Sequence, residues 1–174
     1  MVSPTPKRDD EGMNSPDRND DGPLLICYDG SADAKHAIES AGALLAARPA
    51  LVVTVWQPIA SLDSVVWSGM IVGVDNFAEL DRAAAEAGGR VADEGVRIAQ
   101  QAGLEAEPLA IKAAGPVWKT IVETADRHDA AAIVIGSRGL TGVRSMLLGS
   151  VSSAVAHHAD RPTLVVHRSA GDAG

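Results

Sequence analysis

Cysteine and aromatic residues are scarce in this sequence of 174 residues. It contains one cysteine, Cys27, and aromatic side chains make up only 3% of the chain. A single thiol excludes an intrachain disulfide, which fits a reducing compartment, and its place within an apolar run predicts a small buried hydrophobe.

Long apolar runs are also missing. No stretch approaches the roughly 20 apolar residues that a membrane-spanning helix needs. The first residues mix Lys7 and Arg8 with acidic residues and contain no hydrophobic segment typical of a signal peptide. We therefore expect a soluble, cytoplasmic protein with no membrane partner.

Basic residues are also comparatively few. The 15 lysines and arginines are outnumbered by 23 aspartates and glutamates, which gives a formal net charge of -8. Binding to a phosphate backbone requires a basic surface, so we expect no nucleic-acid partner.

The length and the apolar content indicate a single domain. Apolar residues make up 46% of the 174 residues, enough for one core and too few for two comfortable domains. Residues 1–22 are rich in Pro, Asp, Asn and Ser and predict a disordered tail. The domain is expected to span residues 23–170.

Strand and helix patterns alternate along this domain. Short apolar runs predict strands, and apolar residues three or four positions apart predict helices between them. The strands are expected at 24–28, 51–56, 105–112, 131–135 and 163–167. This alternation is typical of a doubly wound α/β fold, with a mostly parallel five-stranded sheet and helices on both faces.

Two segments depart from this regularity. Residues 57–76 have no clear period, and the pattern leaves open a lid, a partner contact or a short packed helix. Gly88 and Gly89 interrupt a long helix that begins near Phe77 and should end near Gly103, which predicts a kink or close packing.

A glycine-rich loop follows the fourth predicted strand, from Gly136 to Ser150. Ligands of open α/β sheets bind at the carboxyl ends of strands, and glycine permits positive φ angles and close approach of a ligand. Free N–H groups, the start of the next helix and the charges of Arg138 and Arg144 predict a phosphate site. On composition alone, a merely flexible connector is equally consistent with these glycines.

The spacing in this loop resembles the nucleotide signature of the universal stress protein family. That signature is Gly, two residues, Gly, nine residues, Gly, then Ser or Thr, and Gly136, Gly139, Gly149 and Ser150 match every position. Asp29, directly after the first strand region, matches the family aspartate that contacts the ribose and adenine side. The resemblance extends over roughly residues 24–167.

This resemblance implies an adenine nucleotide alpha hydrolase-like fold with strand order 3-2-1-4-5. It also implies binding of ATP, or of AMP or cyclic AMP, together with Mg in some complexes. The implied nucleotide-binding residues are Asp29, Val55, Gly136, Arg138, Gly139, Gly149, Ser150 and Val151.

The expected partners and activity follow from the same resemblance and from the last strand. The last strand is apolar and should form a sheet edge, which predicts a homodimer; a further protein partner is unidentified. The sequence contains no recognisable nucleophile or acid–base set, so we expect nucleotide-dependent regulation in the stress response more than turnover. A slow ATP hydrolase and a nucleotide-independent dimeric interaction module remain the alternatives.

Structural interpretations of the same residues also stay open. Asp29 fits a turn or helix cap, and Ser150 fits an N-cap, either of which is compatible with a ligand contact. His157 and His158 invite a metal interpretation, but neighbouring residues on a helix point in different directions. We therefore predict no metal-binding residues.

Overall fold

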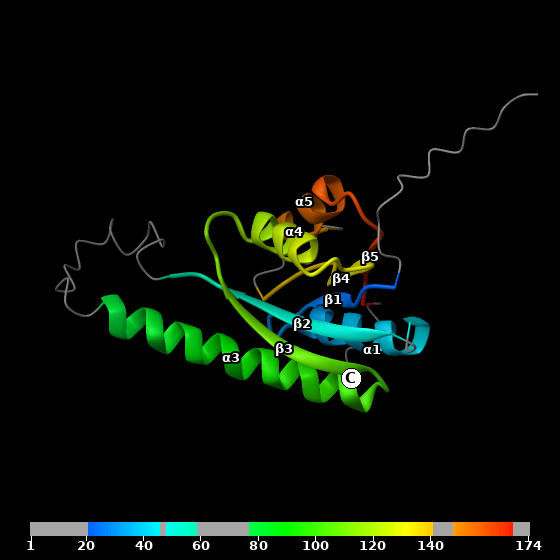
Figure 1. Ribbon diagram of the computed structural model, residues 1–174, viewed down its shortest axis with the longest axis horizontal. Helices are drawn as coiled ribbons and strands as arrows, with labels where there is room; N and C mark the ends of the chain where they lie inside the picture. The colour runs from blue at the N-terminus through cyan, green and yellow to red at the C-terminus, as the bar shows by residue number, and fades with distance from the viewer. Residues whose placement is uncertain (1–20, 46–47, 59–76, 141–147, 169–174) are drawn as a thin grey trace, which may run out of the picture.

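The sequence pattern folds into five strands connected by helices (Figure 1). The computed structural model describes residues 21–45, 48–58, 77–140 and 148–168. In chain order the elements are β1 (Leu24–Cys27), α1 (Ala32–Leu45), β2 (Pro49–Trp56), α3 (Phe77–Gln101), β3 (Glu105–Lys112), α4 (Val117–Arg127), β4 (Ala132–Gly136), α5 (Ser150–His158) and β5 (Thr163–Val166).

The sheet has the order β3-β2-β1-β4-β5, and each neighbouring pair is parallel. The expected order is confirmed, and the sheet described here is wholly parallel. From β1 the chain moves outward through β2 and β3, then returns to place β4 on the other side of β1. The strand order therefore reverses between β1 and β4, where α/β sheets of this kind bind ligands.

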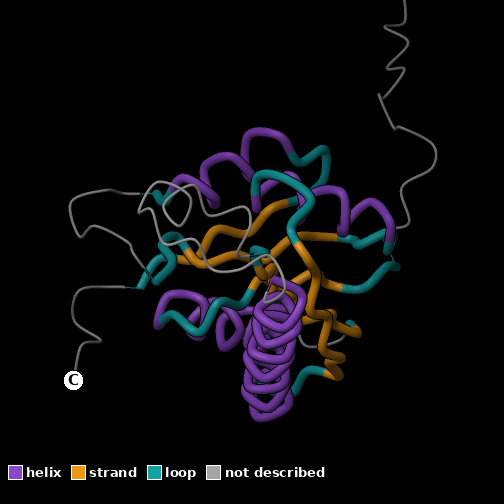
Figure 2. The backbone as a smooth tube through the Cα atoms, turned by 90° about the vertical axis from the view of Figure 1, so that its left-hand side faces the viewer, coloured by secondary structure: helices purple, strands orange, loops and turns teal. Residues whose placement is uncertain are grey.

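Helices cover both faces of the sheet, as expected (Figures 1 and 2). Alternate residues of β1 point to opposite faces: Leu24 and Ile26 pack with α1 and α3, whereas Leu25 and Cys27 pack with α4 and α5. Because both faces are covered, β1 is buried along its whole length. This strand brings the two halves of the core together at the switch point.

The long helix α3 runs without interruption through Gly88 and Gly89. A Cβ at Gly88 would lie 3.1 Å from the Trp56 ring, whereas one at Gly89 would meet nothing within 4 Å. Of the two expectations for this pair, close packing is therefore found at Gly88, where the helix approaches β2. The helix ends as expected before Gly103, whose φ is +84°.

Four of the expected strands differ from β1, β2, β4 and β5 by one or two residues at their ends, and the expected end of the first helix is wrong. Pro49 is predicted to close the first helix, but it is the first residue of β2, and α1 ends at Leu45. A proline fits there because the first residue of a strand can lack a ladder hydrogen bond.

Three sequence predictions fall wholly or largely outside the described residues. They are the tail at 1–22, of which only 21 and 22 are described, the segment 57–76, of which only 57 and 58 are described, and the role of Arg144. Within the described ranges, no helix is both long and apolar enough to cross a membrane.

Candidate functional site

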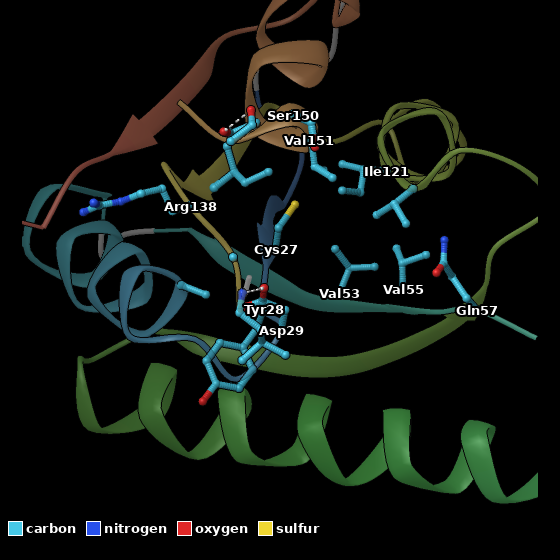
Figure 3. Close-up of a pocket in the computed structure, with 18 residues that line it drawn as sticks. Cys27, Tyr28, Asp29, Val53, Val55, Gln57, Ile121, Arg138, Ser150 and Val151 are labelled. Carbon is cyan, nitrogen blue, oxygen red and sulfur yellow. Dashed lines mark hydrogen bonds between the residues drawn. The ribbon is translucent and has the colours of Figure 1, made fainter. Parts of the chain in front are cut away.

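A cavity of about 580 Å³ opens at the carboxyl ends of β1 and β4 (Figure 3). Its size is within the range of small-molecule sites. The residues that line it come from β1, α1, β2, α4, β4, α5 and the loops between them: Cys27, Tyr28, Asp29, Ala34, Val53, Val55, Gln57, Val117, Ile121, Ile135, Gly136, Arg138, Gly139, Leu140, Gly149, Ser150, Val151 and Ser152. All eight predicted site residues are among them.

One half of the cavity is apolar and continuous with the core beneath α4 and α5. Its walls include Val53 and Val55 on β2 and Ile121 on α4, which Figure 3 shows facing the same space. Cys27 lies at the base of this half, and burial, together with the nearby charge of Asp29, raises the pKa of its thiol from 9.0 to about 12. The thiol is therefore neutral and acts here as an apolar group.

The opposite half is polar and begins at Asp29. One carboxylate oxygen of Asp29 accepts the Ser31 N–H at 2.9 Å, and the other accepts the Leu140 N–H at 3.3 Å. The first bond forms a turn closed by Gly30, whose φ is +84°. Asp29 is thus a turn residue that also connects β1 to the glycine loop, while its exposed side chain lines the cavity.

The signature glycines are required for close approach. A Cβ at Gly136 would lie 2.7 Å from the Asp33 carbonyl carbon, and one at Gly139 would lie 2.6 Å from an Asp29 carboxylate oxygen. The positive-φ glycines of the described chain are Gly30 and Gly103, so neither loop glycine supplies the positive φ that the sequence allows for. Gly136 lets α1 pack on the end of β4, and Gly139 brings the loop against Asp29.

The end of the signature forms the start of α5. Gly149 is the N-cap residue, and Ser150 is the first residue of the helix, so the interpretation of Ser150 as an N-cap is wrong. The first N–H groups of an α-helix have no acceptor within the helix and carry partial positive charge. Ser150 and Val151 lie at this end and line the cavity.

Arg138 lines the cavity, but its guanidinium is engaged elsewhere. Its Nε donates to the Asp33 carboxylate at 3.0 Å, and Figure 3 shows the side chain directed away from the apolar wall. Asp33 also lies 3.7 Å from the Arg168 Nε. The charge predicted for the phosphate site is therefore paired with Asp33 in this structure.

Sequence reasoning missed several residues of the site. Asp33 and Ser137 are buried beside the loop, Gln57 lines the apolar half, and Ser152 donates its hydroxyl to the Ser137 carbonyl at 2.8 Å. The signals available were weak: an acidic residue in the first turn of a helix, a serine between two signature glycines and a glutamine just after a strand. None of these patterns distinguishes a site residue from an ordinary surface residue.

His157 and His158 lie at the end of α5, away from the cavity lining. The His158 ring stacks on Trp118, with the ring centroids 4.3 Å apart. Among the residues that the structure describes, no group of three His, Cys, Asp or Glu side chains is arranged to hold a metal ion. His158 therefore packs α5 against α4.

Comparison with known proteins agrees with this architecture. The sequence model of the universal stress protein family matches residues 22–167. Universal stress protein YxiE of Bacillus subtilis (strain 168) is 27% identical over 148 residues, which cover 82% of this chain and 97% of the relative.

Solved structures share the fold. Protein MJ0577 superposes with a TM-score of 0.69 at 23% identity, covering 86% of this chain and 97% of its own. The universal stress protein from Archaeoglobus fulgidus in complex with dAMP has a TM-score of 0.56 at 26% identity, covering 83% and 97%. The family model spans most of the chain, so this protein belongs to the universal stress protein family.

Proposed function

We propose that this chain binds an adenine nucleotide in the cavity between β1 and β4, with ATP as its ligand. The observation that carries the proposal is the division of one cavity into an apolar half and a half bordered by a glycine loop and a helix N-terminus. A base requires the first, and phosphates require the second. The complex of the Archaeoglobus fulgidus relative with dAMP supports the same class of ligand.

Each predicted residue has a role in this proposal. The base lies against the wall that includes Val55, whose backbone pairs with it, and Asp29 accepts a hydrogen bond from the ribose. The phosphates lie against the backbone of Arg138 and Gly139 and the first turn of α5 at Ser150. A bound Mg would accompany the phosphates. Gly136 and Gly149, together with Val151 on α5, also line the cavity and shape this half of it.

The proposed activity is binding that regulates a stress response in the cytoplasm. Bound nucleotide would bias the loop conformation or a partner interface, because Asp29 hydrogen-bonds Leu140 across the loop and would have to share its carboxylate with a ribose. The proposed location is the cytoplasm, and the free, buried thiol of Cys27 fits its reducing conditions.

The direct test is mass spectrometry of the denatured, freshly purified protein, followed by titration calorimetry with ATP, AMP, cyclic AMP and GTP. We expect a co-purifying adenine nucleotide and saturable heat with at least one adenine nucleotide. GTP controls for phosphate binding without adenine recognition. Absence of both the nucleotide and the heat would contradict the proposal.

Homodimerisation through β5 is a second part of the proposal, and the two sheet edges support it. The β3 edge carries exposed Glu105, Glu107 and Pro108, which oppose pairing with another strand. The β5 edge instead contains Leu164 and Val165, with no charged residue in the strand. A second copy would cover this edge. We expect light scattering at micromolar concentration to give the mass of a dimer, and a monomer mass would contradict this part.

A further inference from the structure

Asp33 is a buried carboxylate beside the cavity whose role the proposed ligand contacts leave unexplained. It is the second residue of α1, and its side chain is only 8% exposed. A carboxylate at the start of an exposed helix needs no tertiary partner, because the helix dipole already favours it there. Burial removes its hydration, so Asp33 must be compensated by the groups around it.

The compensating groups come from the glycine loop and from the end of β5. One oxygen of Asp33 accepts from the Ser137 hydroxyl at 2.9 Å and from the Arg138 Nε at 3.0 Å. The other oxygen lies 3.7 Å from the Arg168 Nε. Two residues that follow β4 are thus bound to one carboxylate on α1.

Ser137, which follows the first signature glycine, is in turn hydrogen-bonded to the other end of the signature. Its carbonyl accepts the Gly149 N–H at 2.6 Å and the Ser152 hydroxyl at 2.8 Å, and its own N–H donates to the Val166 carbonyl at 2.7 Å. Ser137 is fully buried. The start of the loop and the start of α5 are therefore held together at a residue that Asp33 binds directly.

The same carboxylate also binds the guanidinium of Arg138. With its guanidinium bound to Asp33, Arg138 contributes to the cavity lining beside Gly139 and Leu140 without a free charge. Fixed peptide N–H groups bind a phosphate without a cost of reorganisation. A mobile arginine would have to be ordered first.

We propose that Asp33 is the positioning residue of the phosphate half of the site. Through Ser137 and Arg138 it holds the first residues of the loop and the first turn of α5 in the arrangement that binds phosphate. Asp33 itself contacts no ligand. This inference rests on the proposed nucleotide binding and adds the residue that organises one half of it.

The experiment is an NMR titration of the full chain and of Asp33→Asn with ATP and with adenosine, which measures both dissociation constants even when binding is weak. The amide keeps the shape of the side chain but loses its charge. We expect ATP affinity to fall roughly tenfold, the size of one lost charge-assisted hydrogen bond. Adenosine affinity should stay within about twofold, because the base half does not contact Asp33.

Two further variants keep the test decisive. Asp126→Asn removes a half-exposed carboxylate that pairs with the buried Arg161 away from the cavity, and it should leave both affinities unchanged. Ser137→Ala removes only the hydroxyl that binds Asp33, and it should also weaken ATP more than adenosine. If Asp33→Asn fails to fold, the test rests on Ser137→Ala, whose loss of ATP affinity is compared with its loss of adenosine affinity.

The outcomes separate the two proposals. Equal losses for ATP and adenosine, or no loss for either, would overturn the positioning role while nucleotide binding stands. A parent chain that binds neither compound would overturn both. A selective loss of ATP affinity, with circular dichroism unchanged, would establish the role of Asp33.

Discussion

The two halves of the cavity are built from different interactions. The apolar half is an extension of the core, and Ile121 on its wall is 3% exposed and packs with the same cluster as Leu25. The polar half is held by hydrogen bonds to Asp29, Asp33 and Ser137. Changes in the first half should therefore affect stability and binding together, whereas changes in the second can affect binding alone.

The largest effect is expected for Ile121→Ala. The substitution leaves a cavity in the core and should lower the free energy of unfolding by about 2–5 kcal/mol. It should also weaken ATP and adenosine equally, because both place a base against this wall. Urea unfolding and NMR titration measure the two effects.

The matched control for this prediction is Ile38→Ala. Ile38 is fully buried on α1, in the cluster on the other face of the sheet. The Ile38→Ala variant should lose a similar amount of stability. Its affinities for ATP and adenosine should equal those of the parent chain when they are measured under conditions where the variant is folded. If the two variants bound nucleotide equally well, the apolar half would not be a base site.

Gly139→Val tests the polar half of the cavity. The new Cβ would lie 2.6 Å from an Asp29 carboxylate oxygen, so the loop and Asp29 must separate. We expect ATP affinity to fall on the order of 100-fold, equivalent to about 2.7 kcal/mol. Calorimetry measures the affinity, and urea unfolding should show a smaller change in stability than Ile121→Ala causes.

Gly89→Val is the control for that loop variant. A Cβ at Gly89 meets no atom within 4 Å, and this glycine does not line the cavity. Its ATP affinity should equal that of the parent chain. An unchanged affinity in Gly139→Val would show that the glycine loop is only a connector, as the nucleotide-independent alternative requires.

The pH dependence of stability sharpens the description of the apolar half. Burial raises the pKa of Cys27 from 9.0 to about 12, so between these values the unfolded thiol loses its proton while the folded thiol keeps it. Stability is then fully present below pH 9 and declines as the pH rises. Burial, and next its hydrogen bond to Glu94, raise the pKa of Tyr28 and act in the same direction at higher pH.

Urea unfolding of the parent chain and of Cys27→Ala between pH 7.5 and pH 10 tests this account. The variant should be less stable near neutral pH but should lose less stability on going to pH 10. Parallel pH profiles would contradict a buried, neutral thiol at the base of the cavity.

The smallest effect is expected for Gln57→Leu. The Gln57 side chain is exposed at the rim of the apolar half and offers a donor and an acceptor to the polar edge of a base. We expect AMP affinity to fall by roughly threefold, the size of a weak exposed hydrogen bond, with unchanged stability. Gln101→Leu on α3 is the matched control in the same calorimetric titration, and an equal change in both would refute the base contact.

Local sequence patterns predict most of the helices and strands, because the formation of each element depends mainly on residues that are close together in the chain. The alternation of apolar strands and amphipathic helices indicates the fold class, and β1 needs only its run of four buried residues to be recognised. The strand order and the eight site residues are instead implied by the family resemblance, which the spacing of Gly136, Gly139, Gly149 and Ser150 carries. Those residues all line one cavity.

The sequence by itself thus determined the elements, the glycine loop and its place after β4. Only the tertiary structure decided that Arg138 faces Asp33, that Gly136 serves the packing of α1, and that Ser137, at the start of the loop, binds Gly149 at its end. Asp33 and Ser137 are separated by 104 positions in the chain. Their contact depends on how α1 and β4 pack. A local pattern of residues carries no information about contacts between residues so far apart in the chain.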